Sequence, residues 1–334
     1  MAEVQEAFHA GEQAMQLLAG VRERMAEVGQ RVIRDFMPDQ HRELFEKLPY
    51  LLAGSRDTYG RPWASLLVGR PGFVRTPDAQ TMRIAARPAP NDPLTESLRP
   101  GAALGLLGIE LHTRRRNRMN GRITAVEDGA FTLHVDQSFG NCPQYIQARR
   151  PRFVDLPETF AQAHPWQEQG PLLSADAAAL AAQADTFFIA TASAEPDHGG
   201  RSDGVDISHR GGRPGFVRIT EEAGRSVLAV PDYAGNLYFN TLGNIAINPK
   251  AGLLFIDFDS GNLLALTGAA SVILDDPLIA AFQGAQRLLR FEPEAGYLLR
   301  GAVPLRWTEP DYAPQLARTG SWETAAAALK SNPD

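Results

Sequence analysis

The chain has 334 residues, a net charge of −6 and 44% apolar residues. This is typical of a soluble globular protein of two domains, and the acidic balance argues against a general nucleic-acid-binding protein. The single cysteine, Cys142, excludes an intrachain disulfide and a cysteine-only metal cluster, and we expect no metal site. The acidic start and the lack of an apolar run of about 18 residues predict a cytoplasmic protein without a signal peptide or a membrane contact.

Residues 1–44 are predicted to form an N-terminal helical segment. Apolar residues recur at spacings of 3, 4 and 7 from residue 3 to about residue 36, which predicts one helix that packs on the rest of the protein. A second, short helix is expected over Asp39–Lys47, with Asp39 as its N-cap behind Pro38.

Residues 45–150 are predicted to form the first copy of a small β domain. Short apolar runs predict strands over 50–54, 63–68, 82–85, 102–109, 116–125 and 131–135, with turns at 57–61 and 127–129. Residues 151–173 contain prolines and mixed polar residues, which predicts a linker.

Residues 174–310 repeat this plan, and residues 311–334 follow as a C-terminal tail. Ser174 is expected to cap a helix that runs through Gln183. Strands are expected over 187–192, 204–208, 226–230, 252–257, 263–273 and 297–305. Because helices do not alternate with the strands, the pattern favours small barrels over a parallel α/β sheet.

A repeated sequence relates the two copies. The segment RPGFVR occurs at 70–75 and again at 213–218, and GLLGIE at 105–110 is echoed by GLLFID at 252–257. The offsets are 143 and 147 residues, so the register nearly holds across half the molecule. A period of this length indicates a duplicated domain, and hence a built-in pseudo-dimer with one ligand site.

The second copy carries three extra residues just before the repeated segment. They fall in 206–212, DISHRGG, where the first copy has aliphatic residues. Arg210 offers a guanidinium fork, Ser208 a hydroxyl and the glycines close backbone approach, which suits a phosphate monoester. His209 is expected to pair with that phosphate as a cation. The alternative is an ordinary hairpin loop.

A second polar segment lies at 231–244, PDYAGNLYFNTLGN. Its asparagine amides can donate and accept toward a ring edge or a phosphate, and Tyr238 and Phe239 could flank an aromatic ligand. The alternative is that the aromatic residues belong to the core and the asparagines to turns.

These segments resemble a known family. The stretches DISHRGGRPGFVRI, AGNLYFNTLGNIAINPKAGLLFIDF and LALTGAA are similar to the FMN-binding split barrel of the pyridoxamine 5'-phosphate oxidase superfamily. SFGNCPQYIQ, at 138–147, resembles an element of a two-barrel, oxidase-related subgroup. The resemblance implies a mainly β fold with helices (α+β), in which two fused split barrels follow the N-terminal helical segment.

The resemblance also implies the cofactor, FMN, and a set of residues that bind it. One flavin per chain is expected, because only the second copy has the insertion. The expected cofactor-binding residues are Asp206, Ser208, His209, Arg210, Asn236, Tyr238, Asn240, Thr241 and Asn244 in the second copy, Arg118, Asn141 and Tyr145 in the first, and Arg306 in the closing strand.

Arg118 ends a basic run, 114–118. The run could be surface charge, but Arg114, Arg116 and Arg118 share one face of a strand, which favours contact with flavin or an anionic substrate. Cys142 is expected to be a small buried residue.

The sequence therefore predicts an FMN-dependent oxidoreductase that acts on a small molecule. NADH, NADPH or a reductase would supply electrons, and a homodimer is compatible with the sequence. The basic strand of authentic pyridoxamine phosphate oxidases is missing, so oxidation of that substrate is not expected. The alternative function is a non-catalytic carrier of flavin or haem.

Overall fold

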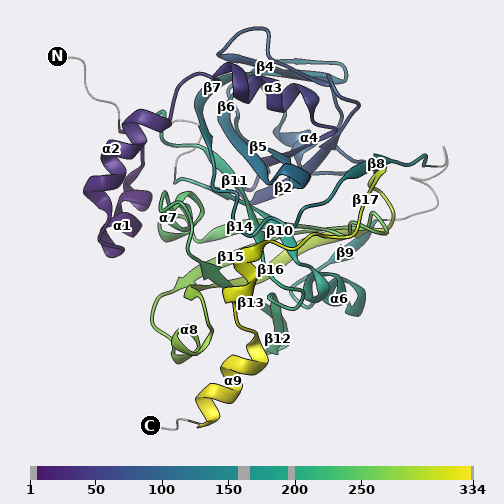
Figure 1. Ribbon diagram of the computed structural model, residues 1–334. Helices are drawn as coiled ribbons and strands as arrows, with labels where there is room; N and C mark the ends of the chain where they lie inside the picture. The colour runs from purple at the N-terminus through teal and green to yellow at the C-terminus, as the bar shows by residue number, and fades with distance from the viewer. Residues whose placement is uncertain (1–5, 157–165, 195–199, 332–334) are drawn as a thin grey trace. The chain divides into compact units, whose positions relative to one another are not determined.

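The computed structural model describes residues 6–156, 166–194 and 200–331 (Figure 1). The chain divides into two compact units, each built from three stretches of sequence. The first unit comprises Met1–Cys142, Ile189–Ser208 and Asn236–Gly252. The second unit comprises Pro143–Phe188, His209–Gly235 and Leu253–Asp334.

Helices are a minor part of the fold. The α-helices of the described residues are α1 (Ala10–Leu18), α2 (Arg22–Val32), α3 (Asp39–Lys47), α4 (Leu94–Ser97), α6 (Ala175–Gln183), α7 (Asn240–Ile247), α8 (Pro277–Ala281) and α9 (Trp322–Ser331). Two short 3-10 helices cover Leu111–Thr113 and Pro314–Arg318. No helix in the described part of the chain is both long and apolar enough to cross a membrane.

Strands make up most of the ordered structure. In the first copy they are β1 (Tyr50–Arg56), β2 (Pro62–Val68), β3 (Val74–Arg75), β4 (Thr81–Ile84), β5 (Ala103–Glu110), β6 (Arg115–Glu127) and β7 (Ala130–Gly140). Between the copies lie β8 (Pro151–Phe153) and β9 (Gln167–Gln169). In the second copy they are β10 (Thr186–Ala192), β11 (Val205–Gly211), β12 (Arg218–Glu222), β13 (Arg225–Tyr233), β14 (Lys250–Ile256), β15 (Leu263–Ile273), β16 (Ala285–Leu299) and β17 (Leu305–Trp307).

The two large sheets have the same strand order. The first runs β2-β1-β5-β6-β7-β4-β3 and the second β11-β10-β14-β15-β16-β13-β12, so each strand of these two paths has a counterpart at the same place. The second sheet also includes β9, which pairs with β16 and has no counterpart in the first. The fold is therefore α+β with mostly antiparallel sheets, as predicted. Within the described residues the end strands of each sheet do not pair with each other, so neither sheet is closed and the predicted pair of barrels is not confirmed.

The repeated RPGFVR segment forms the same turn in both copies. The amide of Phe73 donates to the carbonyl of Arg70 over 2.9 Å, and the amide of Phe216 donates to that of Arg213 over 2.9 Å. Proline followed by a glycine at positive φ suits such a turn, and the two glycines, Gly72 and Gly215, have φ of 93° and 88°. The repeat is thus preserved in backbone conformation.

A second repeated glycine lies at a β-bulge. Register shifts between Asn120 and Gly121 in β6, and between Thr267 and Gly268 in β15. A Cβ at either glycine would lie 2.0 Å from a carbonyl oxygen of the neighbouring strand, so neither position has room for a side chain.

The predicted turn at 57–61 is organised by one carboxylate. Asp57 accepts hydrogen bonds from the backbone amides of Tyr59 and Arg61, both over 2.9 Å, and from the indole of Trp63 over 3.0 Å. Arg61 also forms an ion pair with Asp57, at 2.7 Å. This turn connects β1 to β2 in the first unit.

The structure corrects several predicted elements. The single helix expected over residues 3–36 is two helices, because Gly20 at φ 67° ends α1 and its amide bonds to the carbonyl of Leu17. Asp39 is not a cap but the first residue of α3, where it pairs with Arg42. The expected linker contains β8 and β9, and the strand expected over 297–305 is the end of β16, a turn at Gly301, and the start of β17.

Candidate functional site

Three elements of the first unit bring polar side chains together. Strand β6 supplies Arg118 and Asn120, and β11 supplies Asp206 and Ser208. Side chains two residues apart on a strand point to the same face, so each pair acts as one group. Helix α7 adds further residues from its first two turns.

Asp206 is the centre of this cluster. Its carboxylate accepts from Arg118 Nη1 and Asn120 Nδ2, both over 2.8 Å, and from Asn244 Nδ2 over 2.9 Å. Arg118 and Asp206 are 2% and 7% exposed, so the ion pair is buried. A buried carboxylate is tolerated where charge and hydrogen bonds both compensate it, as they do here. Asp206 therefore fixes the positions of its three donors.

Two hydroxyl groups lie next to this ion pair. Arg118 Nη2 donates to Ser208 Oγ, and Thr241 Oγ1 donates to the same oxygen over 2.9 Å. The Nε of Arg118 is buried and has no hydrogen-bond partner among the described residues. One guanidinium and two hydroxyls therefore converge beside the first turn of α7, to which Thr241 belongs.

Small residues let β11 approach the first sheet. A Cβ on Gly105 would lie 2.3 Å from the carbonyl oxygen of Val205, and one on Gly54 would lie 3.0 Å from that of Asp206. Gly54 and Gly105 are direct partners in the pairing of β1 with β5. Because these glycines have no side chains, the backbone of β11 can lie against the sheet. Asp206 and Ser208 are thereby within hydrogen-bond distance of Arg118.

Sequence analysis missed the contribution of α1 to this cluster. Glu12, 3% exposed, accepts a hydrogen bond from Asn240 Nδ2. It also accepts one from the backbone amide of His9, over 2.9 Å. His9 is the N-cap of α1, and its Nδ1 accepts from the amide of Gly11 over 3.1 Å. The signal in the sequence was the helical spacing that places His9 and Glu12 on the same face as the apolar Met15.

Burial controls the protonation of these two groups. Burial, and then the charge of Asp206, raises the pKa of Glu12 well above its ordinary value, against the hydrogen bonds from the His9 amide and Asn240 and the charge of Arg118. Burial lowers the pKa of His9, although Asp206 and Asp203 oppose the shift. Both shifts are in the direction of the neutral form of each side chain.

The turn before α7 holds two more predicted residues, Asn236 and Tyr238, and a third, Asn141, reaches it from the end of β7. Asn236 Nδ2 donates to Asn141 Oδ1 over 3.3 Å, and Asn236 Oδ1 accepts from the amide of Tyr238 over 3.2 Å. The ring of Tyr238 packs on Phe139 with centroids 5.8 Å apart. Asn236 and Asn141 are thus in contact, as a shared site requires, whereas the Tyr238 ring packs in an apolar cluster of the first unit.

Four of the predicted residues belong to the second unit. Arg210 lies 3.8 Å from a carboxylate oxygen of Asp232, and its Nη1 donates to the carbonyl of His209. The ring of Tyr145 stacks on Tyr233 with centroids 5.0 Å apart. Arg306 is occupied locally, because its Nη1 donates to the carbonyls of Val303 and Leu305, both over 2.7 Å. The predicted set is therefore divided between the two units.

The basic run is not one face of a strand. Arg114 precedes β6 and adopts a left-handed conformation with φ of 56°, so it does not continue the alternation. Arg116 Nε donates to the carbonyl of Cys142 over 2.8 Å, and Arg115 donates to the carbonyl of Gln40. These arginines bind the protein's own backbone. Cys142 itself is half-buried rather than buried.

Comparisons with known proteins give matches only among solved structures. No protein-family model matches the chain, and no curated protein matches it. HupZ of Group A Streptococcus is matched at 13% identity and a TM-score of 0.30, over 40% of this chain and 98% of that one. A candidate pyridoxamine 5'-phosphate oxidase of Lactobacillus delbrueckii is matched at 17% identity and a TM-score of 0.28, over 38% and 93%. HutZ, the haem storage protein of Vibrio cholerae, is matched at 15% identity and a TM-score of 0.25, over 37% and 92%.

Proposed function

We propose that the chain binds FMN and is a flavin-dependent oxidoreductase built from two split barrels, related to the pyridoxamine 5'-phosphate oxidases. The observation that carries the proposal is the convergence of Arg118, Ser208 and Thr241 at the first turn of α7. A phosphate monoester needs a compact group of donors of this kind.

The donor set fits a phosphate in its chemistry. Arg118 has an Nε without a partner among the described residues, and a guanidinium can offer a fork of two N–H groups to one anion. The hydroxyls of Ser208 and Thr241 now bond to each other, and both can turn to donate to phosphate oxygens. The first N–H groups of a helix have no partner within that helix, so α7 can contribute them as well.

FMN, when bound, supplies the hydride- or electron-transfer chemistry. The residues of the chain hold and orient it. Arg118, Ser208 and Thr241 would hold the phosphate, while Asp206 keeps Arg118, Asn120 and Asn244 in place. Asn141 and Asn236, in the same unit, offer amide groups of the kind that can bond to a ring edge.

A flavin titration tests the proposal. The purified chain should bind FMN and show flavin absorption, and riboflavin, which lacks the phosphate, should bind much more weakly. A Soret band and no flavin would instead favour the haem-carrier alternative.

Thr241→Val removes one donor and keeps the side-chain shape. Hydrogen bonds to charged groups are worth about 1.5–3 kcal/mol, so FMN affinity should fall by roughly 10- to 150-fold, with little change for riboflavin. Thr319→Val is the matched control, because Thr319 is also a buried threonine but its hydroxyl donates to the carbonyl of Leu316 in the second unit. An equal loss of FMN affinity in both variants would refute the assignment of the phosphate site.

A further inference from the structure

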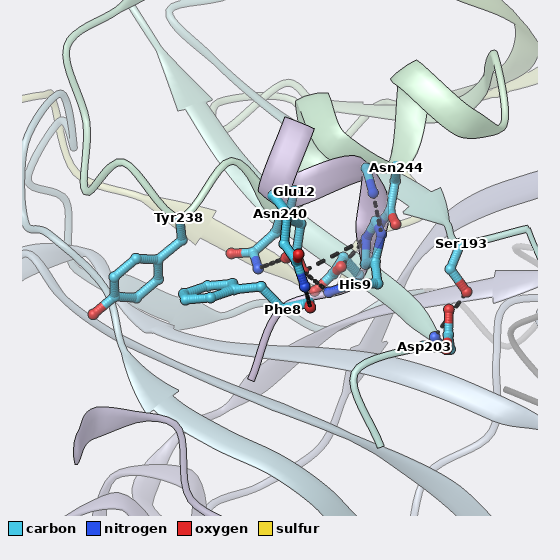
Figure 2. A network of polar contacts seen from close by, with 12 residues as sticks. Phe8, His9, Glu12, Ser193, Asp203, Tyr238, Asn240 and Asn244 are labelled. Carbon is cyan, nitrogen blue, oxygen red and sulfur yellow. Dashed lines mark hydrogen bonds and ion pairs between the residues drawn. The ribbon is translucent and has the colours of Figure 1, made fainter. Parts of the chain in front are cut away.

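Helix α1 crosses α7 at two glycines. A Cβ on Gly11 would lie 2.2 Å from the carbonyl oxygen of Gly243, and one on Gly243 would lie 2.5 Å from the amide nitrogen of Glu12. The backbones therefore touch, and side chains beside the crossing reach across it. Figure 2 shows His9 and Glu12 beside Asn240 and Asn244.

Three contacts from the N-terminal segment hold the turn that leads into α7. Phe8 packs on the ring of Tyr238 with centroids 5.7 Å apart, and Gln16 Nε2 donates to the carbonyl of Tyr238 over 3.2 Å (Figure 2 shows the ring pair). Glu12 binds the side chain of Asn240, the first residue of α7. The turn is thus held by a ring, a backbone contact and a side-chain contact.

The backbone of this turn is strained. Leu237 and Phe239 are not glycines, yet their φ angles are 65° and 63°. Such residues cost about 1–3 kcal/mol each and persist only where surrounding contacts impose the conformation. Since the contacts of Phe8, Glu12 and Gln16 surround the turn, the N-terminal segment helps to impose the backbone that presents Asn240 and Thr241.

We propose that Glu12 is a positioning residue that holds Asn240 and the first turn of α7 for an anionic ligand, and that the affinity of this site falls when Glu12 ionises. The proposal rests on the proposed function, because the ligand it invokes is the phosphate of FMN. An ionised Glu12 would place its own charge at the end of α7 that attracts anions, next to Asp206, and would repel the phosphate.

The charges around Glu12 set the direction of this dependence. His9 faces it from the start of α1, with its Nε2 3.6 Å from the carboxylate, and Asp206 and Arg118 act on it from β11 and β6. Asp203 acts on His9. Burial and Asp206 favour the protonated acid, so the carboxyl ionises only well above its ordinary range. Affinity should be full at lower pH and should fall as pH rises.

The test compares FMN binding at pH 7 and pH 9 in the full chain. The second pKa of a phosphate monoester is about 6, so the ligand is mainly a dianion throughout this range. We expect wild-type affinity to fall as pH rises, by about tenfold for each pKa unit by which the bound phosphate raises the pKa of Glu12. Glu12→Gln removes the ionisation and keeps an amide that can bond to Asn240, so its affinity should change by less than about threefold. Glu27→Gln, at an exposed position of α2, should behave as wild type.

Riboflavin separates the two proposals. Its binding should not share the pH dependence, because it lacks the phosphate. If FMN binds and Glu12→Gln shows the same fall as wild type, the role of Glu12 is refuted while the proposed function stands. If wild type does not bind FMN at pH 7, the proposed function is refuted, and the positioning role is then decided by a ligand-free measurement.

That measurement is amide hydrogen exchange over 237–247, expressed as protection relative to an unstructured chain. At both pH 7 and pH 9, protection should be at least about fivefold lower in Glu12→Ala, which removes the acceptor of the Asn240 amide, and should stay near wild type in Glu12→Gln, which keeps an acceptor. Gly11→Val should lower it at both pH values, because the added Cβ meets a backbone oxygen. Wild-type protection in Glu12→Ala at both pH values would overturn the positioning role even if Gly11→Val fails to fold.

Discussion

The ion pair of Arg118 and Asp206 should be costly to break. The two residues are 2% and 7% exposed, and the charged atoms are 2.8 Å apart. Arg118→Met keeps much of the side-chain volume and leaves a buried carboxylate that retains only its amide donors, Asn120 and Asn244. Removing one partner of a buried pair costs about 3–5 kcal/mol.

Thermal unfolding measures this loss. For a cooperative unit of about 150–250 residues, 1 kcal/mol lowers Tm by about 2–4 °C, so Arg118→Met should lower Tm by roughly 6–20 °C. Arg83→Met is the control, since Arg83 pairs with Glu127 at 2.7 Å but the two side chains are 39% and 55% exposed. An exposed pair contributes at most about 1 kcal/mol.

A double variant completes the experiment. Asp206→Asn alone leaves the guanidinium buried without its counter-charge, whereas Arg118→Met with Asp206→Asn buries no charge. The double variant should therefore be more stable than the sum of the two single losses implies, by about 2 kcal/mol or more. Two results would refute this reasoning: a loss of stability in Arg118→Met no larger than in Arg83→Met, or a loss in the double variant equal to the sum of the two single losses.

Three further predictions concern the bulges, the pH dependence and the flavin. Gly121→Ala and Gly268→Ala should each destabilise by about 1–3 kcal/mol, whereas Gly140→Ala, with its nearest contact at 3.8 Å, should have little effect in the same melting experiment. Burial, with help from Arg115 and Arg34, lowers the pKa of His41 from 6.5 to about 4, so only the unfolded chain takes up this proton as pH falls through that window. Stability should therefore drop by about 3 kcal/mol between pH 6.5 and 4, and His41→Asn should reduce that drop in denaturant titrations. Each chain should bind one FMN in calorimetry, and two tight sites per chain would contradict this expectation.

The sequence predicted local structure better than long-range contacts. The strands of the first sheet other than the two-residue β3, and β15, were found because their apolar runs are bounded by turn residues. The break at Gly20 was missed because the apolar period continues through it. The first part of β16 was missed because charged residues such as Arg287 and Arg290 obscure its alternation.

The candidate site shows the same limit. The residue types were identified in short segments, but the partners lie far apart in sequence: Arg118 meets Asp206, and Asn240 meets Glu12. Only the folded chain reveals that the amides and hydroxyls have partners of their own. Sequence analysis predicted only a packing role for the helix that carries Glu12. The hydrogen-bond partner of Glu12 lies 228 residues away in the chain and is identified only in the folded structure.

The tryptophan that binds Asp57 gives the first unit a fluorescent probe of its own. Trp63, whose indole donates to that carboxylate over 3.0 Å, is its sole tryptophan, since Trp166, Trp307 and Trp322 all belong to the second unit. Replacing those three with phenylalanine would leave one intrinsic fluorophore, and its emission would report the first unit alone. Wild-type emission would come mainly from the second unit. Melting curves of the variant and of wild type would therefore show whether the two units unfold together or one after the other.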